Sequence, residues 1–260
     1  LFGFNSQYNW LTSTVCNAYE RTWEISTDEV HYGWLSPGEN TLRLLRDIQA
    51  GSSVLDAGCG MGENVIALRK MNLDPHGLDI SRHMLRKARK KLSEHGLTDA
   101  SKRLKQCDLR GITSAFKNKF HAILAAYSLD FLPDLPAFRQ SIQVVFDALE
   151  DDGTFVMCVS HPTAHPLYPR LVNETMRTSE GALSVLIYSV RDVVSALCDS
   201  NMVIERIVEQ QTMNPSRVTY PEGKAFPYHF HEGMNPCTPL FDTFSNQNPH
   251  TIIYKARKRS

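Results

Sequence analysis

From residue 52 onward, short runs of apolar and β-branched residues alternate with longer segments whose apolar positions recur on one helical face. The short runs predict strands, and the longer segments predict the helices that connect them. Seven strands are expected, at 52–57, 74–80, 103–109, 121–127, 153–160, 202–208 and 251–257. Ser81 and Asp134 are favourable N-caps for two of the helices, and a third is expected near 190–199. The alternation is typical of an α/β fold, a doubly wound sheet with helices on both faces.

Three segments fall outside this rhythm. Residues 1–35 are rich in Tyr and Trp and predict an N-terminal helical cover, so that the main domain spans 36–260. Residues 161–180 and 211–250 leave the fifth and sixth strands at the carboxyl edge, where doubly wound sheets bind their ligands. Connections of this length are usually functional or disordered. We interpret both segments as lids over a substrate pocket.

The overall composition favours a small or neutral partner. The 28 basic and 28 acidic side chains cancel, so the chain as a whole does not attract nucleic acid or membrane. The six cysteines lie far apart without a CxxC pair, which indicates reduced thiols rather than a disulfide framework or a zinc site. No apolar stretch approaches the roughly 20 residues of a membrane helix. We expect a cytoplasmic protein without membrane contact, either a monomer or a homodimer.

The stretch VLDAGCGMGENV (54–65) has the glycine spacing of a nucleotide-binding turn. A dinucleotide-binding turn follows the order GxGxxG and rests a diphosphate on the next helix. Here Glu63 stands where the third glycine belongs, and Gly62 comes one residue early. A carboxylate at that position repels a diphosphate, but it does not repel a ligand that carries a sulfonium and an ammonium group. The glycines still permit a tight turn close to a ligand.

Two further carboxylates follow at the ends of the next strands. Asp79 ends the second strand, where an acidic side chain accepts hydrogen bonds from ribose hydroxyls. Asp108 ends the third predicted strand, in reach of the amine of an adenine. Asp56, just before the glycines, can also cap the helix that follows. An adenosine with a cationic tail fits this pattern.

Together these stretches resemble class I S-adenosylmethionine-dependent methyltransferases. The resemblance rests on VLDAGCGMG (54–62), GLDIS (77–81), CDL (107–109), AAYSLDFLPDL (125–135) and DDGTFVMCVSHP (151–162). It covers about residues 50–160 and the terminal strand pair, and it implies a Rossmann-like seven-stranded sheet, mostly parallel with an antiparallel last strand. HYGWLSPGE before the first strand and SHP after the fifth resemble the branch that modifies small molecules, often in specialised metabolism such as antibiotic biosynthesis.

The resemblance implies S-adenosylmethionine as cofactor and assigns its contacts. The glycines would line the methionine portion, Asp79 the ribose, and Asp108 with Leu109 the adenine. Tyr127 and Ser128 would lie at the mouth where the methyl group is presented. The complete expected set is Asp56, Gly58, Cys59, Gly60, Gly62, Asp79, Ile80, Met84, Asp108, Leu109, Tyr127, Ser128 and Tyr32.

The acceptor side is expected to carry the proton transfer. His161 directly follows the fifth strand, and it or Asp130 can take the proton from an oxygen or amine nucleophile. The larger effect expected is alignment of nucleophile, methyl and sulfur. Expected substrate contacts are Tyr19, Trp23, His161, His165, Tyr228, His229 and His231. The last two histidines have the spacing of metal ligands on a strand, but without an obvious third ligand no metal is expected.

These residues predict transfer of a methyl group from S-adenosylmethionine to a nitrogen or oxygen of a small-molecule acceptor in natural-product biosynthesis. The basic run within residues 82–91 would suit an RNA substrate, although a solvated helix face also explains it. Methylation of RNA or protein is therefore the first alternative. A regulatory protein that binds S-adenosylmethionine without catalysis is the second, and the acceptor itself is left open.

Overall fold

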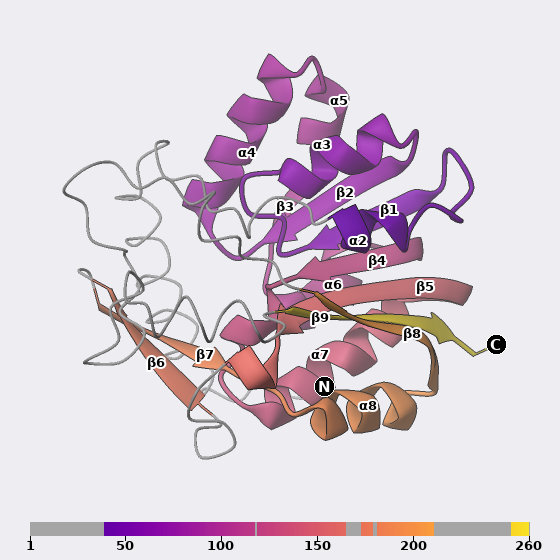
Figure 1. Ribbon diagram of the computed structural model, residues 1–260. Coiled ribbons are helices and arrows are strands. Elements are labelled where there is room, and N and C mark those ends of the chain that lie inside the picture. The colour runs from indigo at the N-terminus through magenta and orange to yellow at the C-terminus, as the bar shows by residue number, and fades with distance from the viewer. Residues whose placement is uncertain (1–38, 118, 165–172, 179–180, 211–250, 260) are drawn as a thin grey trace.

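The computed structural model describes residues 39–117, 119–164, 173–178, 181–210 and 251–259 (Figure 1). Its centre is a seven-stranded sheet in the order β3-β2-β1-β4-β5-β9-β8. The strands are β1 (Ser53–Ala57), β2 (Asp74–Asp79), β3 (Leu104–Gln106), β4 (Phe120–Ala126), β5 (Leu149–Ser160), β8 (Met202–Gln210) and β9 (Thr251–Lys258). Strand β9 runs antiparallel to both β5 and β8, while β1 to β5 pair in parallel. The predicted Rossmann-like sheet with an antiparallel last strand is thus confirmed.

Two strand boundaries differ from the prediction. Strand β3 ends at Gln106, so Asp108 lies beyond the strand rather than at its end. Strand β5 begins at Leu149 instead of residue 153, and its pairing with β4 is irregular between Leu149 and Thr154. Phe120 pairs with Leu149, whereas Ala122 pairs with Thr154. A similar register shift interrupts the β8–β9 pairing between residues 204 and 206.

A separate antiparallel hairpin follows β5. It consists of β6 (Asn173–Thr178) and β7 (Gly181–Leu186). The sequence interpretation placed all of β6 in a lid segment, 161–180, and predicted neither strand. The β6 sequence NETMRT is mostly polar, so hydrophobic periodicity does not identify it as a strand.

Helices cover both faces of the sheet (Figure 1). They are α2 (Glu39–Arg43), α3 (Glu63–Lys70), α4 (Arg82–Glu94), α5 (Thr98–Ser101), α6 (Ile112–Ala115), α7 (Leu135–Ala148) and α8 (Val190–Asp199), with 3₁₀ turns η1 (Leu109–Gly111), η2 (Leu129–Phe131) and η3 (Pro162–Ala164). The residues buried against α6, α7 and α8 form one apolar cluster with the strands. Those of α2, α3 and α4 belong to two clusters on the other face. This arrangement matches the expected doubly wound architecture.

The helices begin where the sequence predicts. The Ser81 hydroxyl accepts a hydrogen bond from the Met84 N–H at 3.1 Å, which starts α4. The Asp134 carboxylate accepts one from the Ala137 N–H at 2.7 Å, and Pro136 stands in the first turn of α7. Such caps satisfy backbone donors that have no partner inside the helix. Both predicted N-caps are confirmed.

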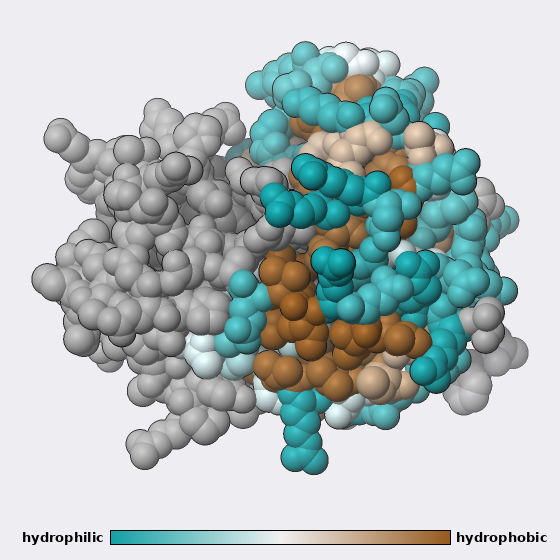
Figure 2. All heavy atoms as spheres, turned by 45° about the vertical axis from the view of Figure 1, so that its right-hand side comes forward, coloured by the Kyte–Doolittle hydropathy of each residue, from teal (hydrophilic) through white to brown (hydrophobic). Residues whose placement is uncertain are grey.

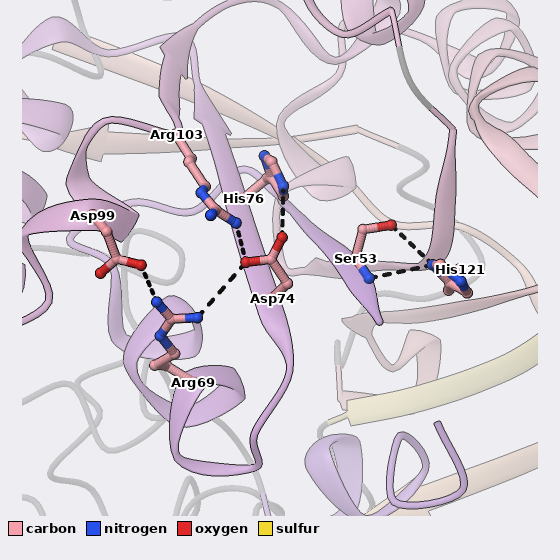
Figure 3. Close-up of polar contacts among 7 residues, drawn as sticks. All are labelled: Ser53, Arg69, Asp74, His76, Asp99, Arg103 and His121. Atoms are coloured by element: carbon pink, nitrogen blue, oxygen red, sulfur yellow. Dashed lines mark hydrogen bonds and ion pairs between the residues drawn. The ribbon is translucent and has the colours of Figure 1, made fainter. Parts of the chain in front are cut away.

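Polar contacts join side chains at the amino edge of the sheet, opposite the edge where ligands bind in this fold (Figure 3). Asp74, the first residue of β2, lies against the side chains of Arg103, Arg69 and His76. At the start of β1, the hydroxyl and the N–H of Ser53 lie 3.0 and 3.2 Å from Nδ1 of the His121 ring. The ion-paired side chains are about one third exposed, so solvent screens these pairs and their role is modest and structural.

The described surface is polar around α4. Figure 2 shows hydrophilic residues over the upper part of the visible face, at the height of α4 and α5, with apolar residues gathered lower. The apolar side of α4 is buried and consists of Met84, Leu85, Ala88 and Leu92. Among the described helices, none combines the length and the apolar character needed to cross a bilayer.

Candidate cofactor site

The glycine loop between β1 and α3 has a conformation that only glycine adopts readily. Gly58, Gly60 and Gly62 have φ angles of 87°, 49° and 84°, all in the left-handed region that side chains disfavour. The N–H groups of residues 58 and 59 both donate to the Leu78 carbonyl at 2.8 Å, which holds the loop against β2. The loop therefore brings bare backbone to the carboxyl edge of the sheet.

The loop after β4 packs directly on this turn. The Ser128 hydroxyl donates to the Ala57 carbonyl at 2.6 Å. A Cβ atom placed on Gly58 would lie 2.2 Å from the Ser128 Cβ, a distance at which two carbon atoms clash. Gly58 is thus required both by its backbone angle and by the approach of Ser128.

Asp79 joins the glycine loop to the end of β2. Its carboxylate is almost fully buried and accepts hydrogen bonds from the Gly60 N–H and the Ser81 N–H, both at 2.8 Å. A carboxylate has about four acceptor positions, so these two bonds are compatible with contacts to a ribose. The contact to ribose stays a prediction, and the structure adds a second role, which is to fix the loop.

Asp56 is the other acidic side chain beneath the loop. It has no exposed surface, and its Oδ1 accepts a hydrogen bond from the Asn64 amide at 3.3 Å. Within the described part of the chain, Asp56 Oδ2 and Asn64 Oδ1 are buried without a hydrogen-bond partner. Burial raises the pKa of the Asp56 carboxyl to about 7, the bond from Asn64 opposes this rise, and the charge of Asp79 adds to it. Two buried acceptors without donors are costly unless a ligand or water supplies the donors.

Glu63, the residue expected to disfavour a diphosphate, is paired with a lysine in the structure. Its carboxylate forms an ion pair with Lys91 of α4, which offsets its charge. Beneath the turn, the charge of Asp79 also acts on Asp56 and helps to raise its pKa. That the turn disfavours a diphosphate stays a prediction, and these two buried carboxyl groups add a reason for it beside Glu63.

The raised pKa of Asp56 makes stability depend on pH with a definite sign. The carboxyl has a pKa near 3.9 in an unfolded chain and about 7 in the fold, so the folded state binds more protons between these values. Its contribution is fully present below pH 4 and is lost as pH rises through 7, with about 2 kcal/mol lost between pH 5 and 7. In urea unfolding, Asp56→Asn should show a fall over that interval smaller than the wild type's by this amount. Equal pH dependence in the two proteins would contradict the assignment.

On the predicted adenine side, Asp108 is held by a neighbouring arginine. It caps η1 and accepts hydrogen bonds from Arg110 Nε at 2.9 Å and Nη2 at 2.6 Å. Burial tends to raise the pKa of Asp108, but the hydrogen bonds and the charge of Arg110 outweigh it and hold the pKa below its usual value. Leu109 follows in the 3₁₀ turn and is half-buried. An adenine amine would thus meet an ionised carboxylate that Arg110 orients.

Three other predicted contacts surround the loop. Cys59 is buried, and burial with the charges of Asp79 and Asp56 raises the pKa of its thiol. The Met84 methyl would lie 3.5 Å from a Cβ on Gly60, so α4 closes against the turn here. The Ile80 carbonyl accepts a hydrogen bond from the Gln106 amide at 3.1 Å. Cys59 is therefore a packing residue in a thiol form rather than a reactive thiolate.

Tyr127, which is predicted to lie where the methyl group is presented, has an unusual backbone angle. Its φ is 55°, which costs a residue with a side chain on the order of 1–3 kcal/mol. The Tyr127 N–H donates to the Cys158 carbonyl at 2.8 Å, and its hydroxyl bonds with Thr251, the first residue of β9. Strained residues held by such contacts cluster at functional sites. Thr251 was not predicted, because it lies 124 residues from Tyr127 in the sequence and no local pattern links the two.

Asp130 and His161 both lie near the end of β5. Asp130 is buried, and its Oδ2 accepts hydrogen bonds from the Ser160 N–H at 3.0 Å and the Ser160 hydroxyl at 2.8 Å. His161 is also buried, with Nε2 3.1 Å from a Glu209 carboxylate oxygen. Its Nδ1 accepts from the Thr163 N–H at 3.1 Å. The structure thus brings the two predicted catalytic residues to one strand end.

These contacts define the proton position on His161. Because Nδ1 accepts a backbone N–H, the proton of the neutral ring lies on Nε2 and is donated to Glu209. To take a proton from an acceptor at Nδ1, the ring would have to release Thr163. The catalytic role of His161 and Asp130 stays a prediction.

The remaining predicted contacts lie outside the described residues. They are Tyr19, Trp23, Tyr32, His165, Tyr228, His229 and His231. The described residues contain no group of three or more His, Cys, Asp or Glu side chains placed to hold a metal ion.

Comparison with known proteins identifies the family. The sequence model of one family, described as "Methyltransferase domain", matches residues 48–233. The chain belongs to this methyltransferase family. The matched range includes the glycine loop, Asp79, Asp108 and the strand ends described above, so the methyltransferase resemblance read from the sequence is confirmed.

Individual relatives of this methyltransferase are distant. Aklanonic acid methyltransferase DauC from Streptomyces sp. (strain C5) is 34% identical over 123 residues, which are 46% of this chain and 54% of the relative. The match thus spans about half the length of that relative. The CcbJ methyltransferase from Streptomyces caelestis superposes with a TM-score of 0.62 at 14% identity, covering 90% of this chain and 94% of the other. Magnesium protoporphyrin IX methyltransferase from Synechocystis PCC 6803, solved with bound SAM, gives a TM-score of 0.58 at 16% identity, covering 96% and 93%. These two structures show that the fold is shared.

Proposed function

We propose that this protein transfers a methyl group from S-adenosylmethionine to a nitrogen or oxygen of a small-molecule acceptor. The observation that carries the proposal is the pair of buried carboxyl groups beneath the glycine loop. Asp56 and Asp79 are both buried there, and in the described part of the chain Asp56 has only the neutral Asn64 amide as its hydrogen-bond partner. A cationic ligand would offset the negative charge of these carboxyl groups, whereas a diphosphate would be repelled by it.

The residues present fit this cofactor. Asp79 would accept hydrogen bonds from the ribose hydroxyls, Asp108 would accept one from the adenine amine, and Asp56 would face the ammonium of the methionine portion. When bound, S-adenosylmethionine supplies a methyl group bonded to a sulfonium sulfur. The neutral thioether that remains after transfer is a good leaving group. The protein then has to hold the acceptor in line and exclude water, an effect that can supply roughly 7–11 kcal/mol.

The acceptor is proposed to bind where β4 and β5 end and β9 begins. Tyr127, Ser160 and His161 lie there, and Asp130 orients Ser160 through two hydrogen bonds. We extend the proposal to the domain organisation, in which residues 36–260 form the transferase domain and 1–35, 161–180 and 211–250 cover its site. The name of the relative DauC supports a small-molecule acceptor in natural-product biosynthesis.

A binding comparison tests the cofactor. We expect calorimetric titration of the purified protein to show micromolar dissociation constants for S-adenosylmethionine and for its product S-adenosylhomocysteine, within the usual range for enzyme ligands. NAD and ATP, which carry diphosphates, should bind at least about a hundredfold more weakly. Incubation with small-molecule acceptors should then add one methyl to one of them, read by mass spectrometry. Tight binding of NAD or ATP with no response to S-adenosylmethionine would refute the proposal.

A further inference from the structure

We propose that Asn64 is a cofactor-positioning residue, which together with Asp56 binds the ammonium group of the cofactor's amino acid. The inference rests on the proposed function, because it assigns a further cofactor contact beside the same buried carboxyl groups. The sequence interpretation did not include Asn64 among the contacts, since it follows the glycines as an ordinary residue in the first turn of α3.

The geometry of the pair supports this role. The Asn64 amide donates to Asp56 Oδ1 at 3.3 Å, so the amide nitrogen is used on the carboxylate. The two atoms left over, Asp56 Oδ2 and Asn64 Oδ1, are both hydrogen-bond acceptors, and both are buried without a partner in the described part of the chain. Two side chains in contact with each other therefore present two unmet acceptors under the glycine loop.

The chemistry of these acceptors selects the ligand group. An ammonium has three donor hydrogens and no acceptor, so it can satisfy both oxygens at once. A ligand hydroxyl has one hydrogen to donate and could satisfy only one of them, while a water could satisfy both but would leave the carboxylate charge without compensation. The positive charge also compensates the Asp56 and Asp79 carboxylates, and charge-assisted hydrogen bonds of this kind are stronger than neutral ones.

A purely structural role for Asn64 predicts something different. If the amide served only to pack α3 and shape the glycine loop, its loss would weaken every ligand of the loop alike, because the loop itself would change. If Asn64 contacts the ammonium, its loss should weaken only ligands that carry that group. The two roles are separated by a pair of ligands that share the nucleoside but differ in the amino-acid tail.

The experiment compares S-adenosylhomocysteine with 5′-methylthioadenosine, which keeps the adenosine and the sulfur but lacks the amino acid. For Asn64→Leu, which has a similar size, we expect calorimetry to show about ten- to hundredfold weaker binding of S-adenosylhomocysteine. Binding of 5′-methylthioadenosine should stay within about twofold of the wild type. If Asn64→Leu does not fold, as judged by thermal unfolding, Asn64→Ala tests the same ratio.

Glu63→Gln is the matched control. It changes a polar side chain in the same turn, but one that faces Lys91 rather than Asp56, so the ratio of the two affinities should not move. Equal weakening of both ligands by the Asn64 variants, or no weakening of either, would overturn the inference. Failure of the wild type to bind S-adenosylhomocysteine would instead refute the proposed function, and this inference with it.

Discussion

Asp79→Ala is expected to reduce the affinity for S-adenosylhomocysteine by at least about a hundredfold. Hydrogen bonds to a charged group contribute about 1.5–3 kcal/mol each, and the proposed ribose contact would lose two of them. The substitution also leaves the N–H groups of Gly60 and Ser81 without their acceptor, so the glycine loop loses its anchor on β2. Isothermal titration calorimetry measures the change, and an affinity within threefold of the wild type would contradict the assignment.

Asp74→Asn provides the control for this experiment. Asp74 and Asp79 are the two ends of the same strand, separated by about 16 Å along β2. Asp74 lies against the side chains of Arg69, Arg103 and His76 at the amino edge (Figure 3). Its pairs are partly exposed, so we expect a stability loss of about 1 kcal/mol or less and an unchanged affinity. A loss of affinity in this variant would mean that general damage to β2 explains the Asp79 result.

Gly58→Ala should destabilise the fold by about 2–5 kcal/mol. A left-handed φ costs a side chain about 1–2 kcal/mol, and forcing a methyl group into a packed site costs about 1–3 kcal/mol more. The added Cβ would lie 2.2 Å from the Ser128 Cβ, so the loop must move and cofactor affinity should fall with stability. Urea unfolding measures the first effect and calorimetry the second.

Gly51→Ala separates the two causes. Gly51 has almost the same angle, 83° against 87° for Gly58, but nothing lies within 4 Å of a Cβ placed on it. It should therefore lose only the 1–2 kcal/mol due to the backbone. Adding Ser128→Gly to Gly58→Ala should recover part of the larger loss. Equal losses for Gly51→Ala and Gly58→Ala would show that contact with Ser128 does not matter.

The sequence predicted the seven strands of the main sheet and the position of Asp79 at a strand end well, because both follow from local patterns. Apolar periodicity located the strands, and Ser81 and Asp134 marked the starts of helices that the structure confirms. Asp79 could be placed because a residue that ends a parallel strand must lie at the carboxyl edge. The polar β6 strand and the irregular pairing at the start of β5 were not predicted, since neither leaves a hydrophobic signature.

Pairwise contacts explain what the sequence interpretation assigned incorrectly or omitted. Glu63 was expected to repel a diphosphate, but its ion pair with Lys91, 28 positions further along the chain, was not foreseen. Asp108 was placed at a strand end, although it caps a 3₁₀ turn and is held by Arg110. Asn64 was passed over because nothing in its local sequence shows that it reaches Asp56. Contacts of this kind depend on tertiary geometry rather than on period or spacing.

The two outer strands of the sheet limit how copies of this protein can associate. Strand β3 has only three residues, and its Lys105 and Gln106 are exposed, while the pairing of β8 is broken by a bulge near Ile204. Short, charged or bulged borders discourage a second chain from extending the sheet by adding its own strand. These features of β3 and β8 therefore disfavour a homodimer in which either border strand is extended by β-augmentation.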